Sequence, residues 1–321
     1  MGTDCEMTSQ ALAGTRAADR IERYLQTEQA LWDHYGLQPT ERFVEVDKPA
    51  ARIRVVEVGS GPPLLVVHGT FGNGPAFAAL AREMPNRRLL LMDRPGFGLS
   101  SPIAYRADGL GTAIADLQRA VLDGLGLNRV DVLGHSIGAN FALRLALHHP
   151  ERVRRVVLLG AGPIVQEAGV PTPIRLIASP LGAIMTRLTR RRVVTLSMIR
   201  GSGHGPALAD RRVPDVLVDW RVAVNRDTDS MWHERAMVRA IVDGARYRPE
   251  LTFADSELAE IQQPTLMLYG TADSVGSPAI WQRVMGSLPN GQLDVLDGVG
   301  HMVWLDDAAA VARRMERFLS D

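Results

Sequence analysis

Ser136 lies in the stretch DVLGHSIGANFALRLALHHP, where an apolar run turns into a helix-like pattern at Gly-His-Ser-Ile-Gly. The flanking Gly134 and Gly138 complete the G-x-S-x-G pattern, in which a serine occupies a sharp turn from a strand into a helix. Small neighbours permit the strained backbone of this turn. The amide of Ile137 would face an oxyanion from the start of the helix. The pattern therefore predicts a nucleophilic serine with Ile137 as one oxyanion donor.

A serine hydroxyl needs a base to accept its proton, and that base needs a carboxylate to fix its tautomer. His301 follows an apolar strand and a Gly-rich turn in LDVLDGVGHMVWLDD, and Asp273 directly follows the buried strand PTLMLYG. Both positions are expected at the sheet edge that also carries Ser136. We predict Asp273 as the acid and His301 as the base, with Glu167 as a second candidate acid.

A second oxyanion donor is expected from the loop HGTFGNG, residues 68–74, which follows the apolar run PPLLVV. Its glycines allow the backbone to approach a substrate closely, and the amides of Thr70 and Phe71 are both candidates. We favour Thr70 over Phe71. His68 is expected to hold the loop through a local hydrogen bond.

The elements that must position these residues form an alternating series. Buried strands near residues 62–69, 87–93, 130–135 and 153–160 alternate with helical patterns, which indicates an α/β fold with a mostly parallel sheet and helices on both faces. The series stops after the sixth strand and resumes near residue 264. We therefore predict a helical extension over residues 1–40, a core over 41–162 and 254–321, and a helical cap over 163–253.

The motifs HGTFGNG, DRPGFGLSS, GHSIG, GTAD and GVGHMVWLDD, in this order, resemble the α/β-hydrolase superfamily, specifically its cap-bearing members. The resemblance covers about residues 41–321. It implies Ser136 as nucleophile, Asp273 as acid and His301 as base, with Ile137 and either Thr70 or Phe71 as oxyanion donors. Relatives that form an alkyl-enzyme carry aspartate at the serine position, so that route is not expected. Carbon–carbon bond hydrolases show a run of glycines that Thr70 and Phe71 interrupt here.

The predicted cap mixes Leu, Ile and Met with arginines, as in PIRLIASPLGAIMTRLTRRRVVTLSMIRG. An amphipathic lid would place the apolar side chains over Ser136 and the arginines toward water, whereas a substrate carboxylate or phenolate would draw an arginine inward. Methionine fills irregular apolar space, which suits a medium-sized hydrophobic acyl or cyclic group. The expected substrate contacts are Met185, Met198 and Trp304.

Charge and composition exclude some classes of binding partner. The formal net charge is zero and Cys5 is the only cysteine, so neither nucleic-acid binding nor an intramolecular disulfide is expected. No apolar run is long enough to span a bilayer, and the N-terminal segment lacks a signal-peptide pattern. We expect a cytoplasmic protein without metal, cofactor or stable membrane insertion. Its expected partner is a small hydrophobic acyl or cyclic substrate, and a homodimer is compatible with the sequence.

The leading functional hypothesis is a carboxylic ester hydrolase-like enzyme that cleaves an ester, thioester or lactone through an acyl-enzyme. Three alternatives use the same fold. They are a carbon–carbon bond hydrolase of the meta-cleavage type, a cyclase or lyase without a covalent intermediate, and a ligand receptor. A strained serine with a complete Ser, Asp and His set argues against the last two, because a binding pocket alone does not need them.

Overall fold

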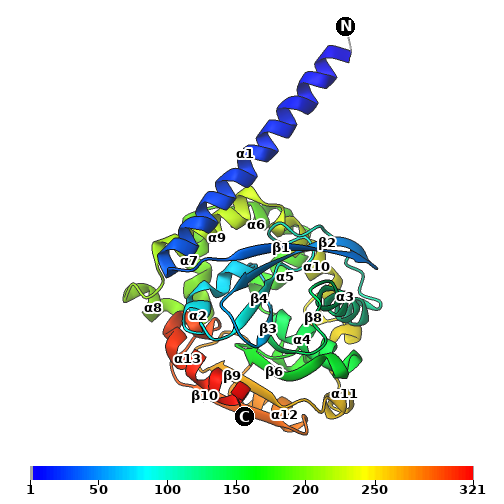
Figure 1. Ribbon diagram of the computed structural model, residues 1–321, viewed down its shortest axis with the longest axis vertical. Helices are drawn as coiled ribbons and strands as arrows, with labels where there is room; N and C mark the ends of the chain where they lie inside the picture. Colours follow the sequence, from blue (N-terminus) through cyan, green and yellow to red (C-terminus); the bar gives the residue numbers. More distant parts are fainter. Residues whose placement is uncertain (1–2, 321) are drawn as a thin grey trace.

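An eight-stranded sheet forms the centre of the molecule, in the strand order β1-β2-β4-β3-β5-β6-β9-β10 (Figure 1). The computed structural model describes residues 3–320, with side chains from Ala17 onward; residues 1–2 of the predicted extension and the side chain of Cys5 lie outside the described part. The strands are β1 (Thr40–Asp47), β2 (Ala50–Val58), β3 (Pro63–Val67), β4 (Arg88–Met92), β5 (Val130–His135), β6 (Val153–Leu159), β9 (Thr265–Gly270) and β10 (Gly291–Leu296).

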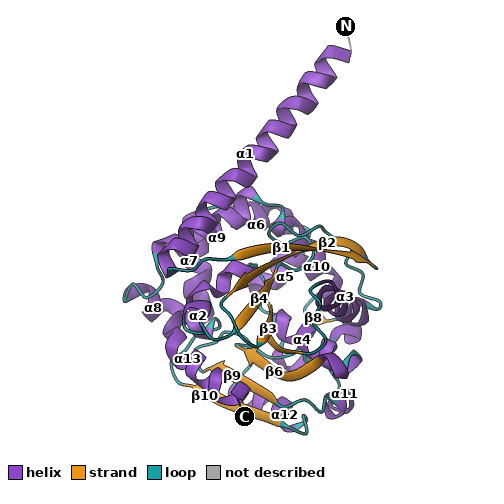
Figure 2. Cartoon of the chain, in the orientation of Figure 1, coloured by secondary structure: helices purple, strands orange, loops and turns teal. Residues whose placement is uncertain are grey.

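Parallel pairing runs from β4 through β3, β5, β6 and β9 to β10, and only β1 and β2 add antiparallel pairs at one edge. Parallel neighbours need helical crossovers, and these cover both faces of the sheet (Figure 2). The core helices are α2 (Ala78–Arg82), α3 (Leu110–Gly124), α4 (Ile137–His148), α11 (Asp255–Glu260), α12 (Pro278–Gly286) and α13 (Val303–Ser320). The predicted α/β class and mostly parallel sheet are confirmed.

Alternation along the central strands divides the hydrophobic core between the two faces. On β3, Leu65 and Val67 join the half of the core that contains α3 and α4, whereas Leu64 and Val66 join the half that contains α2 and α13. All four side chains are fully buried. A strand buried on both faces reads as a continuous apolar run, which is why PPLLVV predicted it correctly.

A helical insertion separates β6 from β9, although these two strands are neighbours in the sheet. We call residues 163–253 the insertion. Its helices are α5 (Thr172–Ala178), α6 (Gly182–Leu188), α7 (Arg192–Ile199), α8 (Gly205–Ala209), α9 (Asp215–Asp227) and α10 (Ser230–Ile241), with a π-helical turn at Arg200–His204. A short hairpin, β7 (Val242–Asp243) and β8 (Arg246–Tyr247), was not predicted from the sequence.

Helix α1 (Thr3–Tyr35) precedes the sheet and lies within residues 1–40, where a helical extension was predicted. Its N-terminal part projects beyond the rest of the molecule (Figure 1). Its C-terminal part packs against α9 and α2, with Tyr24, Leu31 and Trp32 buried. Gly36 ends the helix with a φ of 66°, a left-handed conformation that glycine adopts without steric cost. The extension therefore contacts both the insertion and the core.

Candidate active site

Ser136 occupies the turn between β5 and α4 with φ 55° and ψ −124°. This conformation is costly for a residue with a side chain, and its neighbours show why it is tolerated. A Cβ atom at Gly134 would collide with the backbone of Gly138 and Ala139, and one at Gly138 would collide with the carbonyl of Val67. The two glycines let α4 start directly against the sheet, with the serine at the tip of the turn.

His301 and Asp273 meet at the same edge of the sheet. The Nδ1 atom of His301 lies 2.8 Å from Oδ2 of the buried Asp273, and Oδ1 of Asp273 accepts the N–H of Val275 at 2.8 Å. A carboxylate can only accept, so the ring carries its proton on Nδ1 and leaves Nε2 free to take another. Glu167 is exposed and pairs with Arg283 at 3.3 Å. The geometry thus brings Asp273, not Glu167, to His301.

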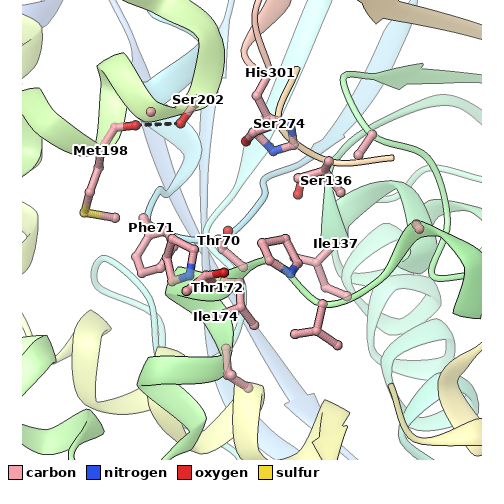
Figure 3. A pocket seen from close by; sticks show the side chains of 18 of the residues that line it. Thr70, Phe71, Ser136, Ile137, Thr172, Ile174, Met198, Ser202, Ser274 and His301 are labelled. Atoms are coloured by element: carbon pink, nitrogen blue, oxygen red, sulfur yellow. Dashed lines mark hydrogen bonds between the residues drawn. The ribbon is translucent and has the colours of Figure 1, made fainter. Parts of the chain in front are cut away.

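A cavity of about 910 Å³ lies in front of Ser136 and His301. These two residues lie on one side of the cavity, and Met198 lies on the opposite side (Figure 3). Most of the lining side chains come from the insertion and are apolar; they include Ile174, Val193, Val194, Met198, Met237, Val238 and Ile241. The cavity therefore offers an apolar compartment of the size that small-molecule sites have.

Two of the three expected substrate contacts are corrected by the structure. Trp304 is buried, donates from Nε1 to the carbonyl of Ala76 at 3.0 Å and stacks on Phe77 with ring centroids 4.5 Å apart. Met185 packs against the hydrophobic core. Neither belongs to the described cavity lining, whereas Met198 does. Trp304 lies in the first turn of α13, and the amphipathic pattern of this helix places its ring in the core rather than in the cavity.

The loop that was expected to supply the second oxyanion donor is held by three charged side chains. Arg94 donates from Nη2 to the carbonyl of Gly69 at 2.9 Å, Glu234 accepts the N–H of Phe71 at 3.0 Å, and Arg221 donates to the carbonyl of Phe71 at 3.1 Å. Phe71 has a φ of 57°. Its amide already has an acceptor. The Thr70 amide has no acceptor among the described groups, so it is the one available to a ligand.

His68 holds the start of this loop, as the sequence predicted. Its Nδ1 lies 2.9 Å from the carbonyl of Gly69, and its Nε2 accepts the N–H of Arg94 at 3.0 Å. Burial, with the nearby Arg94 charge, holds the pKa of His68 well below its usual range. A neutral ring can both donate and accept, which is what these two contacts require.

Arg221 is the main feature of the site that sequence reasoning missed. It lies on α9 and lines the cavity, with Nη1 directed to the sulfur of Met302 at 3.0 Å. Within the described part of the chain it forms no ion pair. Burial lowers its pKa to about 10, so it stays charged at neutral pH. A buried guanidinium without a carboxylate is costly unless a ligand supplies the negative charge.

Neither Arg221 nor Glu234 belongs to a short motif. Arg221 follows the buried Trp220 in a helix that carries two arginines, and Glu234 lies between His233 and Arg235 in SMWHERAM. Arg221 and Glu234 are buried because their helices pack against other elements, including the loop at Phe71. That arrangement is tertiary, and no local periodicity reveals it.

Two further observations concern metal ligands and membrane spans. The side chains described, from Ala17 to Ser320, include no group of three or more histidine, cysteine, aspartate or glutamate residues arranged to hold a metal ion. None of the described helices combines the length and the apolar character needed to cross a membrane.

Comparison with known proteins identifies the fold family. The family model described as alpha/beta hydrolase fold matches residues 62–308, and the chain belongs to this family. Relatives include a 2-hydroxymuconate semialdehyde hydrolase from Pseudomonas putida, which is 28% identical over 84% of this chain and 91% of its own length. A 2-hydroxy-6-oxononadienedioate/2-hydroxy-6-oxononatrienedioate hydrolase from Cupriavidus pinatubonensis is 26% identical over 88% of this chain and 96% of its own.

Solved structures share the same architecture. A carboxylesterase from Bacillus subtilis aligns with a TM-score of 0.73 and 18% identity, covering 94% of this chain and 98% of its own. A 2-hydroxy-6-oxo-6-phenylhexa-2,4-dienoate hydrolase from a Rhodococcus species aligns with a TM-score of 0.72 and 18% identity, covering 89% and 100%. These likenesses establish the fold, and with the family match they make the protein a hydrolase of this class.

Proposed function

We propose that the protein is a serine hydrolase whose substrate carries a carboxylate, and that the insertion is the cap that binds this substrate. Ser136 is the nucleophile, His301 the general base and Asp273 the residue that orients it. The amides of Ile137 and Thr70 stabilise the oxyanion. The observation that carries the substrate class is Arg221, a buried cation in the cavity wall that has no ion-pair partner in the described chain.

The positions of these groups support the following proposed reaction. His301, held at Nδ1 by Asp273, takes the Ser136 proton on Nε2 while the oxygen attacks the substrate carbonyl. The resulting oxyanion meets the Ile137 and Thr70 amides. His301 then passes the proton to the leaving group, and water releases the acyl group from Ser136. The sum adds one water across one bond and yields a carboxylic acid.

Carbon–carbon bond hydrolysis of a dienoate is the first candidate for the bond that breaks. In that reaction the leaving group is a carbon atom that departs with the electron pair of the broken bond. A conjugated 2-oxo acid takes up this pair as an enolate, and His301 supplies the proton. The acid group of such a substrate therefore lies at a fixed distance from the reacting carbonyl. Arg221 supports such an anchor on the insertion side of the cavity. Two relatives are named for the hydrolysis of 2-hydroxymuconate semialdehyde and of 2-hydroxy-6-oxononadienedioate, and both names denote carboxylates.

Ester, thioester or lactone cleavage is the second candidate, and one observation favours it. The loop carries Thr70 and Phe71 where carbon–carbon hydrolases show glycines, and the Phe71 side chain fills part of the cavity wall. A bulkier wall leaves less room beside the oxyanion site for a rigid dienoate, whereas flexible acyl chains adapt to it.

A two-substrate comparison tests the proposal. The purified protein is assayed with 2-hydroxymuconate semialdehyde and with a nitrophenyl ester whose acyl chain ends in a carboxylate. The control for each substrate is the same molecule with that carboxylate converted to its methyl ester. We expect kcat/KM to be at least about tenfold higher for the acid form, since a charged hydrogen bond contributes more than about 1.4 kcal/mol. Equal rates for acid and methyl ester would reject Arg221 as a carboxylate anchor.

Arg221→Gln and Arg221→Lys distinguish a carboxylate anchor from a structural role in holding the loop at Phe71. Arg221 also donates to the Phe71 carbonyl, so a purely structural role predicts equal losses for acidic and neutral substrates. An anchor predicts a loss confined to the acidic substrate, with lysine keeping part of the preference through its charge. Arg226→Gln is the matched control, because this arginine lies on the same helix but pairs with Asp227.

A further inference from the structure

Glu234 is buried, carried by an insertion helix and unused by the proposed reaction. It lies on α10 with its side chain fully enclosed. One carboxylate oxygen, Oε2, accepts the N–H of Phe71 at 3.0 Å, and the other has no hydrogen-bond partner among the described residues. A carboxylate in such a place needs a reason, because burial without full hydrogen bonding is costly.

The contact falls at a position that matters for the proposed oxyanion site. Phe71 directly follows Thr70, and its φ of 57° is a conformation that a bulky residue avoids unless its surroundings enforce it. Glu234 holds the N–H side of Phe71, and Arg221 holds its carbonyl side. Both groups come from the insertion, so the chain segment that shapes the substrate cavity also determines the conformation of this loop.

We propose that Glu234 is a positioning residue for the oxyanion site: its contact with the Phe71 amide fixes the loop so that the neighbouring Thr70 amide stays free for the oxyanion that forms on Ser136 attack. The proposal rests on the proposed function. Without Glu234 the peptide that carries the Phe71 N–H can rotate, and Phe71 can leave its strained conformation. The backbone dihedrals of Thr70 are then no longer held, and with them the direction of the Thr70 N–H is lost. Oxyanion donors act mainly in the transition state, so the loss appears in kcat rather than in KM.

A second role for Glu234 competes with this one. Arg94 is fully buried nearby, and Glu234 is the carboxylate that offsets its charge. In that case the negative charge matters, and the exact reach of the side chain does not. The two roles predict opposite results for two conservative variants. Gln keeps the length and an oxygen that accepts the Phe71 N–H, but it loses the charge. Asp keeps the charge but is one methylene short of Phe71.

The experiment measures kcat, KM and melting temperature for Glu234→Gln and Glu234→Asp with the best substrate found above. Positioning predicts that Gln keeps kcat within about threefold of wild type, whereas Asp loses about thirtyfold or more with KM nearly unchanged. Ser230→Ala is the matched control. Its hydroxyl, on the same helix, accepts the N–H of Gly98 at 3.0 Å, a similar contact that does not involve the oxyanion loop, so kcat should stay unchanged.

The reverse order, with Asp more active than Gln, would overturn the proposal in favour of charge compensation. Equal kcat values for the two variants would overturn it as well. If the Asp variant does not fold, Glu234→Ala takes its place, and a kcat equal to that of the Gln variant is then the contradicting result. Ser136→Ala shows whether the positioning role or the proposed function has failed. If Ser136→Ala is inactive while both Glu234 variants are fully active, only the positioning role is rejected.

Discussion

The ring of His204 accepts a hydrogen bond from the backbone N–H of Met302, the residue after His301, over 3.0 Å. The other ring nitrogen lies 2.8 Å from Asp306, and the carbonyl of Ser202 accepts the N–H of His301 at 2.9 Å. His204 and Ser202 belong to the π-helical turn of the insertion. The insertion therefore holds the turn that carries His301 as well as the loop that carries Phe71.

We predict that His204→Ala lowers both stability and kcat. The variant leaves the buried Met302 N–H without an acceptor, which costs about 1–3 kcal/mol of unfolding free energy. It also frees the turn beside His301, so kcat should fall about tenfold or more while KM changes little. Urea unfolding and steady-state kinetics measure the two effects. The control is His233→Ala, which should keep the wild-type kcat. His233 also lies in the insertion, but the described contacts give it no hydrogen bond to either loop. A wild-type kcat for folded His204→Ala contradicts the prediction.

Ser136→Ala should abolish turnover without loss of the fold. Removing the nucleophile of a serine hydrolase lowers kcat by several orders of magnitude, and only the oxyanion site and substrate binding remain. Alanine also relieves little of the backbone strain, because it keeps a Cβ at φ 55°. Labelling with a fluorophosphonate probe and the ester assay are the measurements. Activity within about tenfold of wild type would reject Ser136 as the nucleophile.

Asp273→Asn should cost far more activity than Glu167→Gln. Asparagine keeps the size of the side chain but can hold His301 in the wrong tautomer, and we expect a loss of up to about ten-thousand-fold in kcat. Glu167 is exposed and pairs with Arg283, so its replacement should be nearly silent. Kinetics of both variants at one pH compare the two carboxylates directly. A silent Asp273→Asn would show that another group orients His301.

The sequence predicted those parts of the molecule that local patterns determine. Buried parallel strands appear as apolar runs, and the Ser136 turn requires glycines at fixed spacing, so both could be recognised. The edge at which Asp273 and His301 meet followed from the rule that parallel strands end together. Their 2.8 Å contact agrees with that expectation.

Contacts that depend on how the insertion folds back could not be predicted. Arg221 and Glu234 are ordinary charged residues of amphipathic helices until α9 and α10 pack against the loop at Phe71. Trp304 illustrates the opposite error: it follows His301 closely in sequence, but the turn at residues 301–303 directs its ring between Phe77 and His135 in the core. Proximity along the chain to a reactive residue does not determine the direction of a side chain.

Glu234 should also make stability depend on pH. Burial raises its pKa from 4.5 to about 7, partly opposed by the charge of Arg94. Between these values the folded protein keeps a proton that the unfolded chain has lost, so the contribution of Glu234 to stability is present below pH 4.5 and is lost as the pH rises through 7. Glu234→Gln does not titrate. Relative to wild type, the variant should gain up to roughly 3 kcal/mol of unfolding free energy between pH 5 and pH 8.

Urea unfolding of wild type and Glu234→Gln at both pH values measures this difference. Asp93, whose pKa burial raises to about 6, adds a slope of the same sign, but it is present in both proteins and cancels. Parallel stability profiles would mean that Glu234 titrates near its ordinary pKa in the folded protein.

Met198 and Met185 provide a paired test of the cavity wall. Met198 lines the cavity opposite Ser136 (Figure 3). Met185 packs against the core and is not among the residues that line the cavity. Met198→Ala should raise KM for long apolar substrates and leave short acyl groups almost unaffected, because each lost methylene contact changes discrimination by only about 1–3 kcal/mol. Met185→Ala should instead lower the melting temperature and leave the chain-length profile unchanged. Kinetics over a graded ester series, with melting curves for both variants, measures the two responses. A profile that shifts with Met185→Ala but not with Met198→Ala would place the apolar part of the substrate against a different wall of the insertion.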